Sequence, residues 1–314
     1  MFHHVKELQF NARVTKPDPR FAALLLEQFG GGNGELKAAM QYFIQAFPAR
    51  RPYPELYDLL MDIATEEFSH LEIVGATITM LTDGINGELK NAVDTNPVAQ
   101  LAGKDNSYRD QMIHEALQNP QFLVQSGGGP VLTNASGVPW SGTFINANGD
   151  PTVDLRSDIA AESRAKIVYE YLLKFTDDPY VQESLRFLMT REITHFQQFT
   201  AALENITPNF PPGNLQGDAR YTHTAFNMSN GEDIRGPWNE GKGRWNDGSE
   251  WNYVSDPIKE VRETNGLINH KEKNSGQSDE DARELEKELS VKRSEKIKKS
   301  VPNGEQQWSE YNNH

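Results

Sequence analysis

Two segments of the chain each place a Glu-x-x-His motif at the centre of an apolar pattern that repeats every three or four residues. The motifs are Glu67 with His70 and Glu192 with His195. Residues at this spacing lie on one face of a helix, with the carboxylate and the imidazole side by side. The surrounding apolar positions include Leu56, Leu60, Ile63, Val74 and Leu81, and Val181, Leu185, Leu188, Phe199 and Ala202. Burying charged groups among them is costly unless something pairs with them.

Two further predicted helices each carry one acidic residue in a comparable place. Glu35 opens one helix, with Tyr42 two turns along the same face, and Glu162 shares a helix face with Tyr169. One Glu from each of two helices, together with Glu-x-x-His from each of two others, is the dinuclear carboxylate site of ferritin-like four-helix bundles. We therefore predict an all-α core, a ferritin-like four-helix bundle in which two divalent ions balance four buried carboxylates.

A single Glu-x-x-His on a helix is most often a solvated pair, and a buried histidine is more often a hydrogen-bonded core residue than a ligand. Two copies on apolar stripes, with two further stripe carboxylates, argue against coincidence. Oxygen and imidazole ligands suit both iron and manganese, so the pattern does not choose the metal.

The composition narrows the other classes of function. The 314 residues include no cysteine, which excludes disulfides, zinc–thiolate sites and thiolate-ligated haem, although a His-ligated haem stays open. The formal net charge of −14 argues against nucleic acid as a partner. The N-terminus lacks the pattern of a signal peptide and no apolar run could span a bilayer, so we expect no membrane partner and a cytoplasmic protein.

The predicted organisation has three parts. Residues 1–207 form the four-helix bundle domain, residues 208–263 an irregular extension that packs on the bundle or on a neighbouring subunit, and residues 264–314 a polar tail. A Gly- and Pro-rich excursion with a short hairpin separates the two halves of the bundle. The expected helices span 20–29, about 34–47 with an end before Pro48, 54–83 closed by Gly84, 107–118, 157–176, and a last one from Pro179 to about 205.

The segments GELKAAMQYFIQAF, EEFSHLE, AAESRAKIVYEYL and REITHFQQF, with the opening MFHHVKELQFNARVTKPDP, resemble the manganese catalases, the non-haem catalases of bacteria. The resemblance covers roughly residues 1–260. It implies that two hydrogen peroxide molecules react to give dioxygen and two water molecules, while a pair of manganese ions cycles between Mn(II)Mn(II) and Mn(III)Mn(III).

The same resemblance implies roles for individual residues. The ligands of the two manganese ions carry over to Glu35, Glu67, His70, Glu162 and His195. Glu192 becomes a catalytic group that lies beside the metals and moves protons, and Tyr42 a hydrogen-bonding residue of the active site, unless it is an ordinary core aromatic.

One position departs from the family. Some members carry an arginine immediately before the fourth glutamate, where this chain has Ala161. Arg164 and Lys166 are the nearby basic residues, and the sequence leaves open whether either one fills that role.

Members with a comparable extension bind calcium between the subunits of a hexamer. The matching positions here are Asp58, Asp62, Asn227, Ser229 and Gly231. Hard oxygen ligands suit calcium. Spacing alone favours a solvated helix face and a turn, whereas the resemblance implies a calcium site and a homohexamer.

The sequence features are compatible with three functions. The first is a manganese catalase that acts on hydrogen peroxide. The second is a ferritin-like di-iron oxidase or iron-handling protein, and the third is a structural protein that keeps the fold, such as a shell component of spores or of the stress response.

Overall fold

The computed structural model describes residues 4–83, 127–206, 223–229, 251–264 and 291. The chain divides into two compact units, Met1–Thr207 and Pro208–His314. Several expectations fall outside the described residues: the helix at 107–118, Gly84, Gly231 and almost all of the polar tail.

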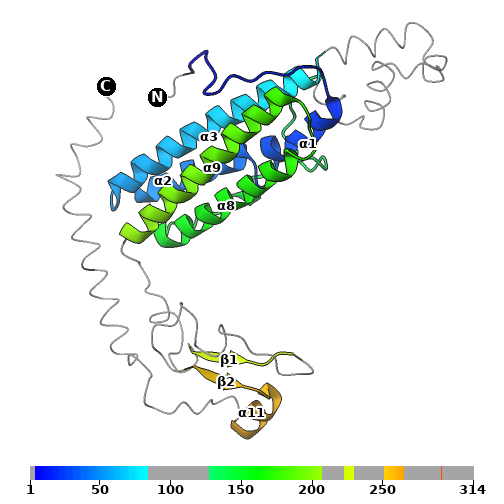
Figure 1. The fold of residues 1–314 in the computed structure, drawn as a ribbon. Helices are drawn as coiled ribbons and strands as arrows, with labels where there is room; N and C mark the ends of the chain where they lie inside the picture. Colours follow the sequence, from blue (N-terminus) through cyan, green and yellow to red (C-terminus); the bar gives the residue numbers. More distant parts are fainter. Residues whose placement is uncertain (1–3, 84–126, 207–222, 230–250, 265–290, 292–314) are drawn as a thin grey trace, which may run out of the picture. The chain divides into compact units, whose positions relative to one another are not determined.

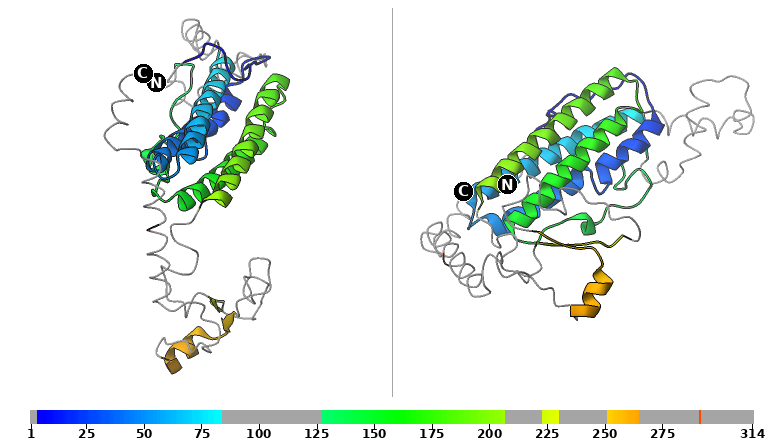
Figure 2. Two further views of the ribbon diagram at one scale, coloured as in Figure 1. Left: turned by 90° about the vertical axis from the view of Figure 1, so that its left-hand side faces the viewer. Right: turned by 60° about the horizontal axis from the view of Figure 1, so that its bottom comes forward.

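The first unit is built on four long helices, which confirms the predicted ferritin-like bundle. They are α2 (Glu35–Ala49), α3 (Pro54–Leu81), α8 (Pro151–Leu172) and α9 (Pro179–Asn205). Short connections join α2 to α3 and α8 to α9, and each pair packs along its length. Helices α3 and α9 lie side by side, and the shorter α1 (Pro19–Gly30) packs mainly on α3 (Figures 1 and 2).

Three of the described helices in the first unit begin at an Asp-Pro pair. Asp18, Asp150 and Asp178 cap α1, α8 and α9 by accepting backbone N–H groups, and a proline follows each of them. Aspartate satisfies the free N–H groups of a first turn, and proline suits the first helical position because its missing N–H would be unpaired there. The predicted start of α8 at residue 157 is therefore wrong: Asp150-Pro151, taken for part of the loop, begins the helix.

The expected end of α2 before Pro48 is also wrong. The helix continues through Pro48 to Ala49. A proline in the last turn removes its own N–H donor, but it does not prevent one further helical residue. The consequence for the site is small, because Glu35 and Tyr42 lie in the first two turns.

The described residues contain two apolar core clusters. One cluster joins α1 to the C-terminal half of α3 and includes Ile73 and Leu188. The other joins α2 to the N-terminal half of α3 and includes Ile63 and Phe199. The two Glu-x-x-His motifs fall between these clusters in sequence, on α3 and on α9.

Residues 4–18 form an N-terminal arm that contacts both α3 and α9. Gln9 donates to Glu66 (2.8 Å) and His4 pairs with Glu72 (3.0 Å), both on α3. Arg13 donates to Glu183 on α9 (2.6 Å). Phe10 also stacks on Phe187 of α9, with ring centroids 4.6 Å apart. The arm therefore bridges the two helices that carry the Glu-x-x-His motifs.

The excursion between the two halves contains the predicted short hairpin where it is described. Thr133 and Pro139 form an antiparallel bridge, and Trp140 N donates to Leu132 O at 2.8 Å. A single 3-10 turn, η1 (Gly142–Phe144), leads on toward α8.

In the second unit, the described residues contain short regular elements. Strand β1 (Thr224–Phe226) pairs in parallel with β2 (Asn252–Val254), and α11 (Pro257–Thr264) follows. The sequence predicts an irregular extension over 208–263 and overlooks the Asp256-Pro257 start of α11, where Asp256 accepts from Lys259 N at 3.0 Å. Among all the described helices, none combines the length and the apolar character that crossing a membrane requires.

Candidate metal centre

The four helices bring the six predicted side chains of the dinuclear site together. They are Glu35 of α2, Glu67 and His70 of α3, Glu162 of α8, and Glu192 and His195 of α9, and each is at most 1% exposed. Their ligand atoms form two groups, in each of which the atoms lie within 4.8 Å of one another. The groups share Glu67 and Glu192; one adds Glu35 and His70, and the other adds Glu162 and His195.

Local chain geometry sets the position of Glu35 at the first turn of α2. A Cβ on the preceding residue, Gly34, would lie 2.6 Å from the backbone oxygen of Gln28, so only glycine fits there. Gly34 is the N-cap of α2. Glu35 therefore lies at the positive end of a helix dipole, which favours its carboxylate form.

Glu67 lies between the two imidazoles. Its Oε2 is 2.9 Å from His70 Nδ1, and its Oε1 is 2.8 Å from His195 Nδ1. Among the described residues, neither Glu67 Oε1 nor His195 Nδ1 makes a hydrogen bond, despite the short distance. The imidazole rings are stacked, with centroids 5.5 Å apart. One carboxylate thus faces the inner nitrogens of both histidines.

The remaining carboxylates take up separate positions around the imidazoles. Glu35 Oε2 is 3.6 Å from His70 Nδ1, and Glu162 Oε2 is 3.9 Å from His195 Nδ1. Each of these oxygens is buried without a hydrogen bond to the described residues. Buried acceptors left in this way are costly. Oxygen and imidazole atoms that converge without partners fit a pair of divalent cations, and the residues present therefore suit a dinuclear metal centre.

The electrostatics of the cluster show the same need for positive charge. Burial and the neighbouring charge of Glu67 raise the pKa of Glu35 to about 7 and that of Glu162 to about 8. Burial also raises the pKa of Glu67, but the charges of His70 and His195 outweigh it and hold the value well below its ordinary range. Protons are thus retained on part of the cluster when no cation neutralises it.

The two tyrosines form a reciprocal arrangement. Tyr42 of α2 donates to Glu162 Oε1 of α8 (2.5 Å), and Tyr169 of α8 donates to Glu35 Oε1 of α2. Both rings are fully buried. Burial and nearby carboxylates raise the pKa of both phenols, so that they remain hydrogen-bond donors. Tyr42 therefore touches a predicted ligand, and Tyr169 does so equally, a role that the sequence did not reveal.

Glu192 differs from the other carboxylates in its surroundings. Both of its oxygens are buried without a hydrogen bond to the described residues, and Oε1 is 3.7 Å from His70 Nδ1. Burial, followed by the charges of Glu35, Glu67 and Glu162, raises its pKa well above the ordinary value. These surroundings favour the protonated acid.

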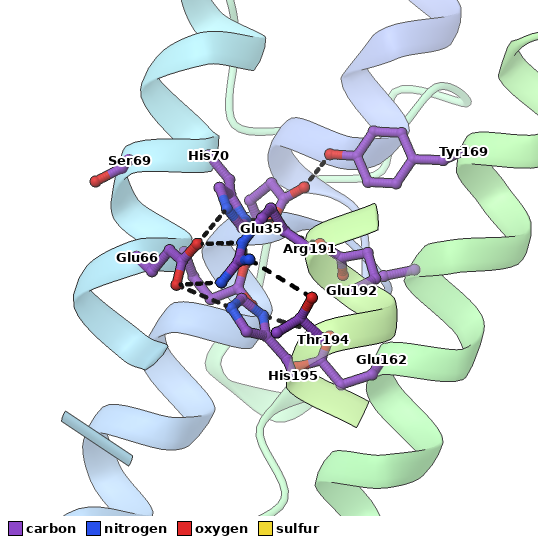
Figure 3. Close-up of polar contacts among 12 residues, drawn as sticks. Glu35, Glu66, Ser69, His70, Glu162, Tyr169, Arg191, Glu192, Thr194 and His195 are labelled. Carbon is purple, nitrogen blue, oxygen red and sulfur yellow. Dashed lines mark hydrogen bonds and ion pairs between the residues drawn. The ribbon is translucent and has the colours of Figure 1, made fainter. Parts of the chain in front are cut away.

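A carboxylate on the outer side of the histidines was missed from the sequence. Glu66 lies 3.5 Å from His70 Nε2 and 3.2 Å from His195 Nε2. Arg191 of α9 donates to both of its oxygens, at 2.6 and 3.2 Å (Figure 3). The sequence did carry a signal for this contact with His70: Glu66 lies four residues earlier, one helical turn away on the same face.

Neither basic residue near Ala161 lies in the cluster. Arg164 donates to Asn33 at 2.9 Å, and Lys166 pairs with Glu170. Lys37 is instead a buried basic residue on α2, 2% exposed, whose Nζ makes no hydrogen bond to the described residues. Burial and the charge of Arg164 lower the pKa of Lys37 to about 8, although the charges of Asp158 and Glu162 act in the opposite direction.

The residues implied in calcium binding belong to two separate units. Asp58 and Asp62 are exposed on α3. In the second unit, Asn227 Oδ1 accepts from Ser229 N at 3.1 Å, which closes a small turn after β1, and Gly231 lies outside the described residues.

Comparison with known proteins gives one family. The sequence profile described as manganese containing catalase matches residues 1–295. A probable manganese catalase of Clostridium acetobutylicum is 39% identical over 208 residues, 66% of this chain and 81% of the relative. A manganese catalase of Bacillus subtilis is 33% identical over 267 residues, 82% of this chain and 91% of the relative.

Solved structures give the same result. The crystal structure of KatB, a manganese catalase from Anabaena, matches with a TM-score of 0.63 and 34% sequence identity. The match covers 82% of this chain and all of that chain (100%).

Proposed function

The chain belongs to the manganese catalase family, and we propose that the six buried side chains of the metal centre are the site of its reaction. The chain is a non-haem catalase that disproportionates hydrogen peroxide to dioxygen and water at a dimanganese centre. Metal binding and proton transfer are assigned to different residues of this centre.

Five of the six side chains are the proposed ligands of two manganese ions per subunit: Glu35, Glu67, His70, Glu162 and His195. The observation that carries this assignment is the position of Glu67, which places one oxygen within 2.9 Å of each inner histidine nitrogen. A carboxylate in that position can serve two ions at once. When bound, the manganese ions supply the redox chemistry by cycling between Mn(II)Mn(II) and Mn(III)Mn(III).

Glu192 is the proposed proton carrier. The family resemblance supports this role. Glu35 and Glu162 each accept a hydrogen bond from a tyrosine, whereas neither oxygen of Glu192 accepts one from the described residues, and its surroundings favour the protonated acid. Cleavage of the O–O bond needs protons at the departing oxygens, and an acid within the cluster can deliver and recover them. Tyr42 supports this chemistry by holding Glu162 with its hydroxyl group.

The decisive experiment is elemental analysis of the purified protein, with peroxide-dependent oxygen release measured on the same sample. We expect about two manganese ions per chain and vigorous oxygen evolution. Two iron ions with slow peroxide consumption would contradict the assignment, as would folded protein that binds no metal. The comparisons lend no support to the iron-handling alternative.

We also propose the finer features that the family resemblance implies. These are a homohexamer, a calcium ion held between subunits by residues that include Asp58, Asp62, Asn227, Ser229 and Gly231, and a cytoplasmic location. Exposed aspartates on α3 and the Asn227 turn supply oxygen ligands of the kind that calcium prefers.

The calcium proposal is tested by the variant Asp58→Ala. We expect weaker assembly with peroxide turnover per chain maintained, measured by light scattering coupled to gel filtration, with and without a calcium chelator. Assembly that neither the substitution nor the chelator changes would contradict the proposal.

A further inference from the structure

Glu66 contacts both histidines of the metal centre on the side away from the cluster. Its Oε1 lies 3.5 Å from His70 Nε2, and its Oε2 lies 3.2 Å from His195 Nε2. The side chain is 20% exposed, whereas both imidazoles are fully buried. One carboxylate thus spans the outer nitrogens of the two rings, with the distances of ion pairs (Figure 3).

Other groups hold Glu66 in this position. Arg191 places Nε 2.6 Å from Oε1 and Nη2 3.2 Å from Oε2, a two-point contact that orients the carboxylate plane. Gln9 of the N-terminal arm adds a hydrogen bond to Oε1 at 2.8 Å. The nitrogens of arginine and of a glutamine amide can only donate, so Glu66 acts as an acceptor on both oxygens.

The Glu66 oxygens bear on where the two histidines would carry their protons once Nδ1 binds a metal ion. A neutral imidazole has one N–H, and the hydrogen bond made by one ring nitrogen selects the state of the other. Without a bound metal ion, the effect of burial is outweighed by the surrounding carboxylates, which raise the pKa of both imidazoles, and neither Nε2 completes a hydrogen bond to the described residues. A metal ion bound at Nδ1 would take the lone pair of that nitrogen and leave the proton of each ring on Nε2, which faces a Glu66 oxygen at 3.5 Å in His70 and 3.2 Å in His195. The two Nδ1 atoms are those that face Glu67, at 2.9 Å in His70 and 2.8 Å in His195.

We propose that Glu66, clamped by Arg191, is a positioning residue that fixes the tautomer and ring orientation of both metal-binding histidines. This inference rests on the proposed dimanganese site. Carboxylates beyond the ligands commonly orient metal-bound histidines, and losing one typically costs tenfold to hundredfold in metal affinity. Here a single carboxylate serves both histidines.

The repeated motifs of α3 and α9 explain how the clamp arises. Glu66 directly precedes the Glu67-x-x-His70 motif, and Arg191 directly precedes the Glu192-x-x-His195 motif. Equivalent positions on two helices that lie side by side therefore carry opposite charges, and the two side chains meet beside the histidine pair.

The test is the variant Glu66→Gln. A glutamine has one acceptor oxygen, so it can accept from only one imidazole and presents its NH₂ group to the other. The oxygen should take the Oε1 position, because Arg191 Nε and Gln9 both donate there. His195 then faces a donor and must carry its proton on Nδ1, the ligand atom.

We expect Glu66→Gln to make the two manganese sites unequal. Competition titration with a fluorescent chelator should show one site near the affinity of the unchanged protein and one about 10- to 100-fold weaker. Electron paramagnetic resonance should show a mononuclear Mn(II) signal at two equivalents of added manganese. These readouts do not depend on peroxide turnover.

The matched control is Glu183→Gln, which breaks an exposed ion pair between a glutamate and an arginine, here Glu183 of α9 and Arg13 of the arm. It should leave both manganese affinities unchanged. Arg191→Gln is a second variant that keeps Glu66 but removes the clamp, and it should weaken both sites severalfold.

Two results would overturn the inference. One is Glu66→Gln protein that binds two manganese ions with unchanged affinities and an unchanged spectrum. The other is equal weakening of both sites together with a lower melting temperature of the metal-depleted protein, which indicates a merely structural role. If the unchanged protein itself fails to bind two manganese ions, the proposed function has failed instead.

Discussion

The helix pair α2–α3 and the pair α8–α9 supply matching side chains to the metal centre but do not give them matching surroundings. Glu35 and Tyr42 are seven residues apart on α2, as Glu162 and Tyr169 are on α8. Each tyrosine bonds the glutamate of the opposite pair. To this extent the two halves are interchangeable.

The two helix pairs differ at the glutamates of their Glu-x-x-His motifs, Glu67 and Glu192. Glu67 lies between both imidazoles, whose charges lower its pKa despite burial. Glu192 lies beside carboxylates, and burial together with their charges raises its pKa. A repeated motif thus fixes where a side chain lies, whereas the neighbours across the bundle decide whether its pKa is lowered or raised.

The strongest test of this difference compares Glu67→Gln with Glu192→Gln. We expect Glu67→Gln to lose most of its manganese and its activity, because the charged carboxylate that faces the inner nitrogens of both histidines is gone. Glu192→Gln should keep two manganese ions per chain while turnover falls roughly 10²- to 10⁴-fold, the usual contribution of a proton-transfer group. Elemental analysis and oxygen release on the same samples decide the matter. Loss of metal from the Glu192 variant would make Glu192 a ligand and remove the contrast.

The likeness of the halves is tested by Tyr42→Phe and Tyr169→Phe. Each change removes a buried hydrogen bond to a carboxylate, worth about 1.5–3 kcal/mol. We expect each to lower manganese affinity about 10- to 100-fold, measured by competition titration. Equal losses would confirm matching roles. A loss of turnover at full manganese occupancy in the Tyr42 variant alone would give Tyr42 a catalytic role that Tyr169 lacks.

A third prediction concerns Asp158, which lies one turn before Glu162 on α8. Helix α2 has no residue equivalent to Asp158, because it begins at Glu35. Burial raises the pKa of Asp158 to about 7, despite the hydrogen bond from Gln41 (2.7 Å) and the charge of Lys37, and with a smaller contribution from Asp154. The native state therefore holds a proton that the unfolded state releases near its ordinary pKa of 3.8. The free energy of unfolding should fall as the pH rises from about 4 to about 7.

Asp158→Asn keeps the acceptor for Gln41 and removes this titration. We expect the variant to be about 2–4 kcal/mol more stable than the unchanged protein at pH 7.5, with the difference shrinking toward pH 4. Urea unfolding at several pH values measures it, with Asp83→Asn, a change at an exposed aspartate, as control. A difference that does not change with pH would show that Asp158 is ionised in the native state.

The smallest effect is expected at the basic residues of α8. Arg164→Gln and Lys166→Gln should change turnover by less than about twofold, because their head groups bond Asn33 and Glu170 outside the cluster. Steady-state oxygen release measures this. A large loss in either variant would mean that an exposed residue of α8 tunes the site in place of the missing arginine.

The sequence predicted the buried residues of the site better than the charged residues that lie outside them, Glu66 and Arg191. Glu67, His70, Glu192 and His195 interrupt apolar stripes, and such interruptions are visible in a helical pattern. Glu66 and Arg191 flank those stripes at half-exposed positions, where charged residues are ordinary, so only the packing of α3 on α9 reveals their contact. The start of α8 could have been predicted, since Asp150-Pro151 repeats the signal that begins α1 and α9.

The N-terminal arm also has a consequence for the order of events during synthesis. Arg13 and its partner Glu183 are 170 residues apart in the chain, and Thr15 and Asp178 are 163 apart. At about 5–20 residues per second, the arm waits roughly ten to thirty seconds on the ribosome before its α9 partners exist. His195 and Arg191 are made later still. His195, the last of the proposed ligands, and Arg191 therefore leave the ribosome almost together, and the proposed manganese site can be complete only after α9 has left the exit tunnel.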